Sequence, residues 1–275
     1  MKRQRPETSD QRPEPQAPRL DAARIERDLG TRRVGRHVLC FAEVDSTNDV
    51  ALTAARQADA DGLAVLAEHQ RAGRGRMGRT WHSPPGANLL LSVLLTEDAG
   101  ALPHEAVTIA AGLAVAEAVG ETAGLAAELR WPNDVLLGGG KVAGVLVERR
   151  QVDAVRAVVI GVGVNVAAAP PEAVRLPATC LAAHAEGPID RGELARALLR
   201  RLDVWVARIA AGALESLHAA WITRCGMLHE WVRVRCGQEV HEGTVVDVSP
   251  MEGLLLATDA GRLVHLPAEL STLLP

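Results

Sequence analysis

Aromatic residues are scarce in this chain. Its 275 residues include no tyrosine, one phenylalanine and five tryptophans, although 48% of them are hydrophobic. The core must therefore be built mainly from Ala, Leu and Val. We expect three of the tryptophans, Trp205, Trp221 and Trp231, to lie in the core or at a domain interface.

The cysteines are few and scattered. Cys40, Cys180, Cys225 and Cys236 form no Cys-x-x-Cys pair. A disulfide framework or a cysteine metal site is therefore unsupported. We expect four reduced thiols, as in a cytosolic protein, and no protein-only metal centre.

A secretory leader and a long hydrophobic run are also missing. The charged N-terminus is followed by no apolar segment of the kind that signal peptides contain. The most apolar long run, residues 106–120, contains Glu117 and is shorter than the roughly 20 residues that span a bilayer. We expect a cytoplasmic protein that does not bind membranes.

Charge gives no general reason to expect nucleic-acid binding, since the net charge is -4. Residues 1–36 hold ten Lys or Arg against six Asp or Glu. Residues 1–18 have almost no apolar side chains, which predicts a disordered, solvated tail. Residues 20–29 predict one short helix, which is too little for a helix-turn-helix. We group residues 1–37 as a tail with this helix.

Apolar patterning predicts a mixture of strands and helices after this tail. We expect strands at 37–44, 63–69, 88–95, 127–131, 135–137, 141–149 and 154–166, and helices at 49–58, 103–121, 191–211 and 215–225. Several strands in succession indicate an α+β fold with a mixed sheet rather than regular βαβ units.

The pattern changes near Met227. Short strands are predicted at 231–236, 239–248, 254–258 and 263–266, separated by turns that contain Gly or Pro. This meander is long enough for a small SH3-like barrel. We therefore expect two domains, residues 38–226 and 227–275.

The segment from Gln70 to Arg79 is rich in glycine and arginine. Glycine lets a backbone approach a ligand closely, and arginine grips carboxylate and phosphate oxygens in pairs. The Gly73-x-Gly75-x-x-Gly78 string matches a dinucleotide fingerprint, but no helix pattern follows it. The segment therefore predicts a loop that wraps an anionic small molecule and becomes ordered when it does so.

Several other short motifs carry polar groups. Residues 45–48 read either as a helix cap, with Ser46 and Asp49 in a loosened capping box, or as a ligand-binding helix N-terminus. Arg130 and Lys141 add positive charge, and Asn133, Asp134 and Asn165 add hydrogen-bonding groups. Together with the loop, these residues suit the activation of a carboxylate by ATP, in which two repelling anions must be held together.

Five motifs in order resemble those of biotin protein ligases, over roughly residues 38–275. They are Asp45-Ser46-Thr47-Asn48, Gln70-x-Ala72-Gly73-Arg74-Gly75-Arg76-x-Gly78-Arg79-x-Trp81, Trp131-Pro132-Asn133-Asp134, Lys141-x-Ala143-Gly144-x-Leu146-x-Glu148 and Gly161-x-Gly163-x-Asn165. The resemblance implies a catalytic domain similar to class II aminoacyl-tRNA synthetases. It also implies synthesis of biotinyl-5′-adenylate from biotin and ATP with Mg²⁺, and transfer of biotin to a lysine of a biotin carboxyl carrier protein domain.

The resemblance also implies roles for individual residues. The expected catalytic residues are Lys141, Arg76 and Asp134, of which Asp134 would orient or deprotonate the incoming lysine. The expected biotin-binding residues are Ser46, Thr47, Asn48, Gln70, Gly73, Arg74, Arg76, Lys141, Gly144 and Gly161. The expected ATP-binding residues are Arg74, Arg76, Trp81, Asn133, Lys141 and Asn165.

Two departures from the family affect the interpretation. Arg130 stands where the family usually has lysine, so a planar fork replaces a point charge. The sequence also shows no DNA-reading domain, which favours a ligase over a biotin-responsive repressor. A lipoate or octanoate ligase or transferase of the same fold is the nearest alternative, and a non-catalytic binding module is a third. Family members occur as monomers and as homodimers, and the sequence leaves both states open.

Overall fold

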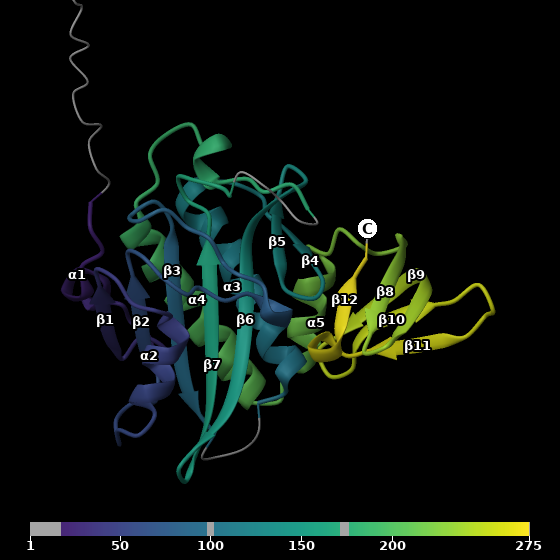
Figure 1. The fold of residues 1–275 in the computed structure, drawn as a ribbon, viewed down its shortest axis with the longest axis horizontal. Helices are drawn as coiled ribbons and strands as arrows, with labels where there is room; N and C mark the ends of the chain where they lie inside the picture. The colour runs from purple at the N-terminus through teal and green to yellow at the C-terminus, as the bar shows by residue number, and fades with distance from the viewer. Residues whose placement is uncertain (1–17, 98–101, 171–175, 275) are drawn as a thin grey trace, which may run out of the picture.

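A seven-stranded mixed sheet dominates the computed structural model, which describes residues 18–97, 102–170 and 176–274 (Figure 1). The strands run in the order β1-β2-β3-β7-β6-β5-β4, and only β1 and β2 are parallel neighbours. They are β1 (His37–Phe41), β2 (Leu63–Ala67), β3 (Leu89–Thr96), β4 (Glu128–Arg130), β5 (Asp134–Leu137), β6 (Gly140–Val152) and β7 (Val155–Val164). The expected mixed sheet is confirmed. Of the predicted disordered tail, residues 1–17 lie outside the described residues.

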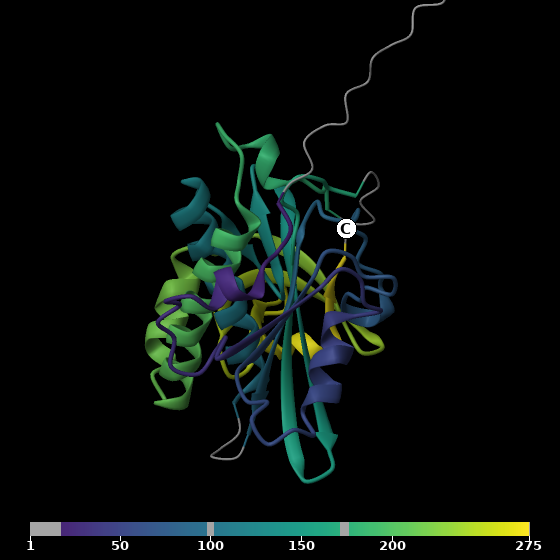
Figure 2. The ribbon, with the colours of Figure 1, turned by 90° about the vertical axis from the view of Figure 1, so that its left-hand side faces the viewer.

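Helices cover both faces of this sheet, as Figure 2 shows. On one face lie α3 (His104–Ala123), α4 (Arg191–Ala210) and α5 (Leu214–Ile222), and on the other lies α2 (Thr47–Ala54). Successive residues of a strand point to opposite faces. In β2, Ala64 and Leu66 accordingly join the larger core cluster, whereas Leu63 and Val65 join the cluster under α2. This strand is therefore buried on both faces.

The apolar helix α3 is longer than the apolar run at residues 106–120. Its 20 residues are long and apolar enough to cross a membrane by length and composition alone. In the fold it is mostly buried, packed between the sheet and α4. Small side chains such as Ala110 and Ala114 allow this close packing, which fits a core poor in aromatics.

The short N-terminal helix α1 (Ala22–Glu26) packs onto the body of the protein rather than belonging with the tail. Ile25, Leu29 and Val34 are buried in the larger core cluster. The carboxylate of Asp203 accepts hydrogen bonds from the backbone N–H groups of Arg32, Arg33 and Val34 at 2.8–2.9 Å. These hydrogen bonds hold the segment on α4.

Helix α2 differs from its prediction at both ends. It begins at Thr47 and ends at Ala54, whereas the sequence indicated 49–58. Ser46 occupies the N-cap position, but its side chain makes no capping hydrogen bond, so the expected capping box is wrong. Asp49 instead binds Arg74.

A second, five-stranded antiparallel sheet lies beside α5 (Figure 1). Its order is β11-β10-β9-β8-β12, and its strands are β8 (Trp231–Cys236), β9 (Glu239–Ser249), β10 (Gly253–Ala257), β11 (Leu263–Leu266) and β12 (Ser271–Leu273). The sequence did not predict β12, which has three residues. Val234, Leu254 and Leu273 share the larger core cluster with the first sheet.

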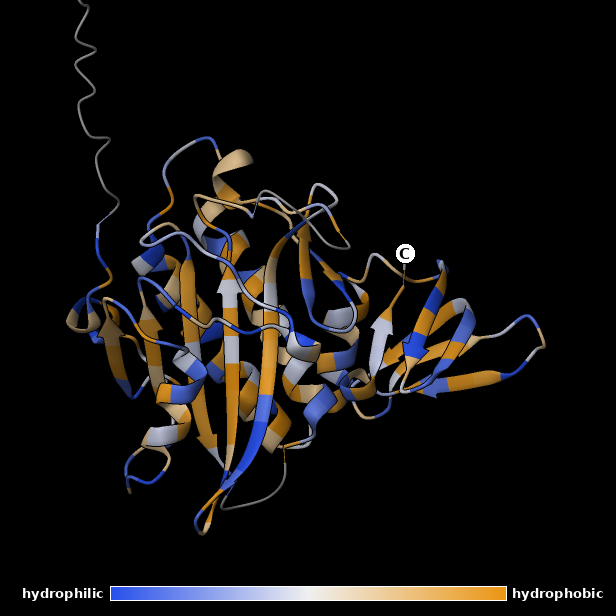
Figure 3. Ribbon diagram, in the orientation of Figure 1, coloured by the Kyte–Doolittle hydropathy of each residue, from blue (hydrophilic) through white to orange (hydrophobic). Residues whose placement is uncertain are grey.

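The distribution of hydrophobic residues follows the layers. Figure 3 shows that strands of the larger sheet are hydrophobic along most of their length, and that β6 becomes hydrophilic toward its hairpin with β7. Trp205 and Trp221 are buried, as expected. Trp231 is 53% exposed, so its predicted burial is wrong, because its position on β8 points away from the core of the smaller sheet.

Candidate active site

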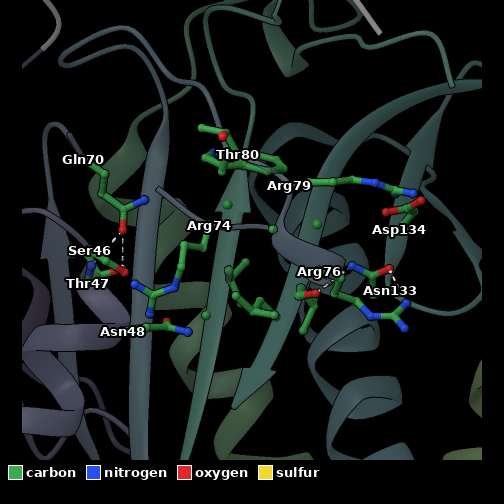
Figure 4. A pocket seen from close by; sticks show the side chains of 18 of the residues that line it. Ser46, Thr47, Asn48, Gln70, Arg74, Arg76, Arg79, Thr80, Asn133 and Asp134 are labelled. Carbon is green, nitrogen blue, oxygen red and sulfur yellow. Dashed lines mark hydrogen bonds between the residues drawn. The ribbon is translucent and has the colours of Figure 1, made fainter. Parts of the chain in front are cut away.

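A cavity lies where α2, the Gly/Arg loop and strands β5 to β7 meet (Figure 4). Twelve of the predicted site residues line it: Ser46, Thr47, Asn48, Gln70, Arg74, Arg76, Trp81, Asn133, Asp134, Lys141, Gly144 and Gly161. These residues come from segments up to about a hundred positions apart in the sequence. The fold therefore gathers most of the predicted site into one cavity.

Hydroxyl and amide groups are concentrated at one end of this cavity. Gln70 Oε1 accepts hydrogen bonds from Thr47 N at 2.7 Å and from Thr47 Oγ1 at 2.9 Å. Both bonds use the carbonyl oxygen of Gln70, so its amide nitrogen is turned away from Thr47. This end of the cavity can therefore donate N–H and O–H groups to a polar ligand.

A buried serine supports these groups from below. Ser92 on β3 is fully buried, and its Oγ lies 2.7 Å from Thr47 Oγ1 and 2.6 Å from Asn48 Oδ1. Asn48 Nδ2 donates to Glu148 Oε2 at 2.7 Å. Because each bond restricts the next side chain, Thr47 and Asn48 are held in fixed orientations.

The Gly/Arg loop closes on itself above the sheet. Trp81 N donates to Gly73 O at 2.9 Å, and Gly75 N donates to Arg79 O at 2.7 Å. Between these bonds the chain makes a single 3₁₀ turn, η1 (Arg76–Gly78), in which Met77 has a positive φ of 56°. No α-helix follows it, which confirms that the glycine string is not a dinucleotide fingerprint.

Arg74 is paired with two carboxylates. It forms a two-pronged contact with Asp49 at 2.6 and 2.7 Å, and a further ion pair with Glu148 at 3.1 Å. These hydrogen bonds raise the pKa of Arg74, and the bond from Arg74 lowers the pKa of Asp49. Two acidic side chains thus offset the positive charge of Arg74 within the loop.

Arg76 points to the opposite side of the cavity from Arg74, beside Asn133 (Figure 4). Its Nη1 donates to Asn133 Oδ1 at 3.2 Å. Its Nη2 donates to the carbonyl oxygens of Ala268 and Ser271, the latter at 3.0 Å. Both carbonyls belong to the C-terminal sheet region, so that region reaches the edge of the cavity.

Lys141 and Asp134 form an ion pair within the cavity. Lys141 Nζ lies 2.5 Å from Asp134 Oδ1, and the Asp134 side chain is only 5% exposed. The same Nζ lies 5.7 Å from the centre of the Trp81 ring, within the range of a cation–π contact. Two of the expected catalytic residues are thus in direct contact.

Two glycines on β7 make room for side chains of the site. A Cβ at Gly161 would lie 2.4 Å from Asn48 Oδ1, and one at Gly163 would lie 2.4 Å from Trp81 Cε2. Such distances do not occur in real structures, so both positions require glycine while Asn48 and Trp81 keep these places. The biotin contact expected at Gly161 stays a prediction.

Two of the predicted site residues do not line the cavity. A Cβ at Gly73 would lie 2.6 Å from Trp81 O, so this glycine serves the closure of the loop. Asn165 is 2% exposed, and its Nδ2 donates to Thr179 O at 3.0 Å. Arg130 is also outside the cavity lining, because its guanidinium pairs with Glu230 at 3.2 Å.

The described residues contain no group of three or more His, Cys, Asp or Glu side chains suited to hold a metal ion. Asn165 Oδ1 is buried and has no hydrogen-bond partner in the described part of the chain. Mg²⁺ commonly keeps waters and takes substrate phosphate oxygens as ligands. The oxygen groups near the cavity fit a Mg²⁺ ion that arrives with a nucleotide, but they do not form a protein-only cage.

Sequence reasoning missed several residues of the site. Glu148 and Gly163 stood in the quoted motifs without a role, and Asp49 was read as a helix cap. Ser92 gave no signal, since a lone serine in an apolar strand is unremarkable in sequence. Thr272 lines the cavity from β12, which the sequence did not predict.

Comparisons with known proteins agree with this geometry. A family model described as "Biotin/lipoate A/B protein ligase family" matches residues 40–165. The chain is 36% identical to a biotin–[acetyl-CoA-carboxylase] ligase of Paracoccus denitrificans, over 83% of this chain and 98% of that protein. It is 37% identical to the ligase of the same name from Mycobacterium tuberculosis, over 88% and 95% of the two chains.

Solved structures give the same result. A solved structure of a biotin protein ligase from Aquifex aeolicus, in complex with biotin and ATP, is similar to this fold with a TM-score of 0.74. The sequences are 28% identical, and the match covers 86% of this chain and 97% of that one. From its motifs, its fold and these relatives, the chain belongs to the biotin protein ligase family.

Proposed function

We propose that this protein activates biotin with ATP to biotinyl-5′-AMP and transfers the biotinyl group to a lysine of a biotin carboxyl carrier protein domain. The observation that carries the proposal is the arrangement of the cavity. Polar groups of Ser46, Thr47 and Gln70 lie at one end, and the cations of Arg74, Arg76 and Lys141 lie along the rest. A ligand with a neutral polar head and a carboxylate tail fits this order of groups.

The first step joins the two substrates. A biotin carboxylate oxygen attacks the α-phosphorus of ATP, a phosphorus–oxygen bond forms, and the bond to pyrophosphate breaks. Lys141 and Arg76 reduce the repulsion between the two anions and stabilise the charge that develops on the phosphate oxygens. We assign Arg74 to the carboxylate and Asn133 to the nucleotide, whereas Asn165 lies outside the cavity lining and its expected ATP contact stays a prediction. Bound Mg²⁺ supplies further neutralisation of the phosphates.

The second step transfers the acyl group. The acceptor lysine, as a neutral amine, attacks the acyl carbon of the adenylate, and AMP leaves with the electron pair of the broken carbon–oxygen bond. Asp134 orients the amine or accepts its proton. Its contact with Lys141 keeps this carboxylate at the point where the carboxyl group and the phosphate meet. Closure of the Gly/Arg loop, with Trp81, shields the mixed anhydride from water.

The finer assignments belong to the same proposal. The larger domain is similar to class II aminoacyl-tRNA synthetases, supported by its mixed, mostly antiparallel sheet backed by helices. The smaller domain is an SH3-like barrel, supported by its five short antiparallel strands. The protein works in the cytoplasm, where biotin, ATP and carboxylases meet.

The test is a reconstituted reaction. Purified protein, biotin, ATP and Mg²⁺ are mixed with a carrier domain, and covalent biotin on the carrier lysine is measured by intact-mass spectrometry. We expect one biotin per carrier, dependent on ATP and absent when the acceptor lysine is replaced by arginine. Lipoate and octanoate replace biotin in parallel reactions. Modification by either of them in preference to biotin would overturn the proposed substrate.

A further inference from the structure

A buried glutamate of α3 forms a hydrogen bond with the C-terminal region of the chain. Glu105 lies in the first turn of α3 and is only 7% exposed. Its Oε1 accepts a hydrogen bond from Ala268 N at 2.6 Å. Burial raises the pKa of Glu105 to about 6, while the Ala268 bond and the charge of Arg76 oppose that rise. Nothing in the two reaction steps uses this carboxylate directly.

The peptide that Glu105 holds also holds Arg76. Ala268 begins the 3₁₀ turn η3 (Ala268–Leu270), and its carbonyl oxygen accepts from Arg76 Nη2. Ser271 O, just after the turn, accepts from the same nitrogen at 3.0 Å. Ala268 is therefore fixed from both sides, by Glu105 at its N–H and by Arg76 at its carbonyl.

Neighbouring residues hold the turn in the same place. His104 Nδ1 lies 2.9 Å from Glu269 Oε1, so the start of α3 lies against the middle of the turn. Thr272, the next residue after Ser271, lines the cavity. Ser271 and Leu273 are buried on either side of it, as the alternation of a strand requires. The turn thus lies at the rim of the candidate active site.

The kind of acceptor matters for the charge of Arg76. Three oxygens that bind it, from Asn133, Ala268 and Ser271, are uncharged. Arg74, in contrast, is bound by the carboxylates of Asp49 and Glu148. Amide and carbonyl oxygens fix a guanidinium in place without neutralising it. These three contacts set the position of Arg76 without placing a carboxylate beside it.

We propose that Glu105 is a positioning residue for adenylate formation: it fixes the turn at Ala268–Ser271, and the carbonyls of this turn hold Arg76 at the cavity for the ATP phosphate. The C-terminal sheet region is then a working part of the nucleotide site. The inference rests on the proposed function for the role of Arg76, and it assigns to Glu105 an effect transmitted through that arginine.

A double-mutant cycle tests this transmission. Biotinyl-AMP formation is measured without carrier for wild type, Glu105→Ala, Arg76→Ala and the double variant. We expect Glu105→Ala to lower kcat/KM for ATP about tenfold, the equivalent of one charge-assisted hydrogen bond, with KM for biotin nearly unchanged. On the Arg76→Ala background the same change should have no further effect. Additive losses would overturn the proposal, because they would mean that Glu105 does not act through Arg76.

Two further variants separate positioning from general stability. Glu105→Gln keeps an oxygen acceptor for Ala268 N and should retain activity within about threefold of wild type. Glu121→Gln, an exposed glutamate in the last turn of the same helix, is the matched control and should leave all parameters unchanged. Activity of Glu105→Gln as low as that of Glu105→Ala would contradict the proposed hydrogen bond.

A measurement without substrates keeps the test independent of the enzyme assay. Amide hydrogen exchange should be faster at residues 268–271 in Glu105→Ala, with the rest of the smaller sheet unchanged. If Glu105→Ala does not fold, Ala268→Pro removes the donor instead and should give the same loss. A wild-type protein that makes no adenylate would refute the proposed function. Unchanged exchange at residues 268–271 would refute only the positioning role of Glu105.

Discussion

Arg74 and Asp49 form a bidentate ion pair, in which Nη1 and Nη2 of the guanidinium bind the two carboxylate oxygens at 2.6 and 2.7 Å. The contact ties the Gly/Arg loop to the first turn of α2. Arg74 is 37% exposed and Asp49 50% exposed at the side chain, so the pair is screened by solvent and contributes about 1 kcal/mol at most. This is enough to change how often the loop opens.

Asp49→Asn should therefore loosen the empty loop. We expect trypsin to cleave within residues 71–79 about fivefold faster than in wild type, because cleavage follows the population of the open form. Biotin with ATP should slow the cleavage in both proteins, since the ligand orders the loop. Asp153→Asn, which removes a more exposed ion pair with Arg56, is the control and should not alter the rate. Equal cleavage of Asp49→Asn and wild type would disprove the anchoring role.

Gln70→Glu should weaken biotin binding while leaving the fold intact. The carboxylate can still accept from Thr47, but it has no N–H group for a ligand oxygen and adds negative charge near Asp49. We expect KM for biotin to rise about 10- to 100-fold, equal to roughly 1.4–2.8 kcal/mol, with kcat changed much less. Steady-state kinetics at varied biotin would check this.

The exposed Gln57→Glu variant carries the same change of charge just beyond α2. Its KM for biotin should equal that of wild type. An equal rise in both variants would mean that overall charge, rather than the contact at Gln70, controls binding.

Gly163→Ala should displace Trp81 from its place against β7. The added Cβ would lie 2.4 Å from the indole ring, so the ring must move and the loop that carries it must move as well. We expect at least a tenfold loss of kcat/KM for biotin, with a matching change in tryptophan fluorescence. Gly187→Ala, where no atom lies within 4 Å of the new Cβ, should behave as wild type. Full activity of Gly163→Ala would show that Trp81 is not required in this position.

Glu105 should make stability depend on pH. Its pKa rises from 4.5 to about 6 on folding, so its protonated form favours the native state. The corresponding stabilisation is fully present below pH 4.5 and is lost as the pH rises through 6, by up to ~2 kcal/mol. Relative to wild type, Glu105→Gln should therefore become more stable over this range. Urea unfolding at pH 4.5, 5.5, 6.5 and 7.5 measures the trend.

Glu121 provides a control of opposite sign for this trend. Hydrogen bonds from Arg201 and Arg200 lower its pKa, so its stabilisation is present above pH 4.5 and is lost as the pH falls through the lowered pKa. Parallel curves for Glu105→Gln and wild type would show that the Glu105 carboxyl does not titrate in this range. The groups that face Glu105, namely Ala268 N, Glu269 and Arg76, are unchanged in this variant.

Local chemistry made much of the fold readable from the sequence. The long α4 was predicted almost to the residue, because Asp190 caps its first turn and leucines repeat at helical spacing. The hairpin of β5 and β6 followed from three consecutive glycines between apolar runs. β12 could not be predicted, since three residues that pair with β8 carry no pattern of their own.

The members of the site were likewise readable, but their partners were not. The ordered motifs of Gly, Arg, Lys and Asn predicted the site residues, and twelve of these residues line one cavity. The sequence could not show that Arg74 pairs with Asp49, that Arg76 turns to the carbonyls of Ala268 and Ser271, or that Arg130 pairs with Glu230. These contacts join positions 25 to 195 residues apart, and backbone carbonyls leave no trace in a sequence.

The sequence by itself thus determined the chemistry that the cavity can hold, because residue types and their spacing within a motif are local properties. Only the tertiary structure decided how each cation is held at the cavity. That depends on whether the nearest oxygens belong to carboxylates or to carbonyls. For Arg76 the answer comes from a turn almost two hundred residues away, held in place by the buried carboxylate of Glu105.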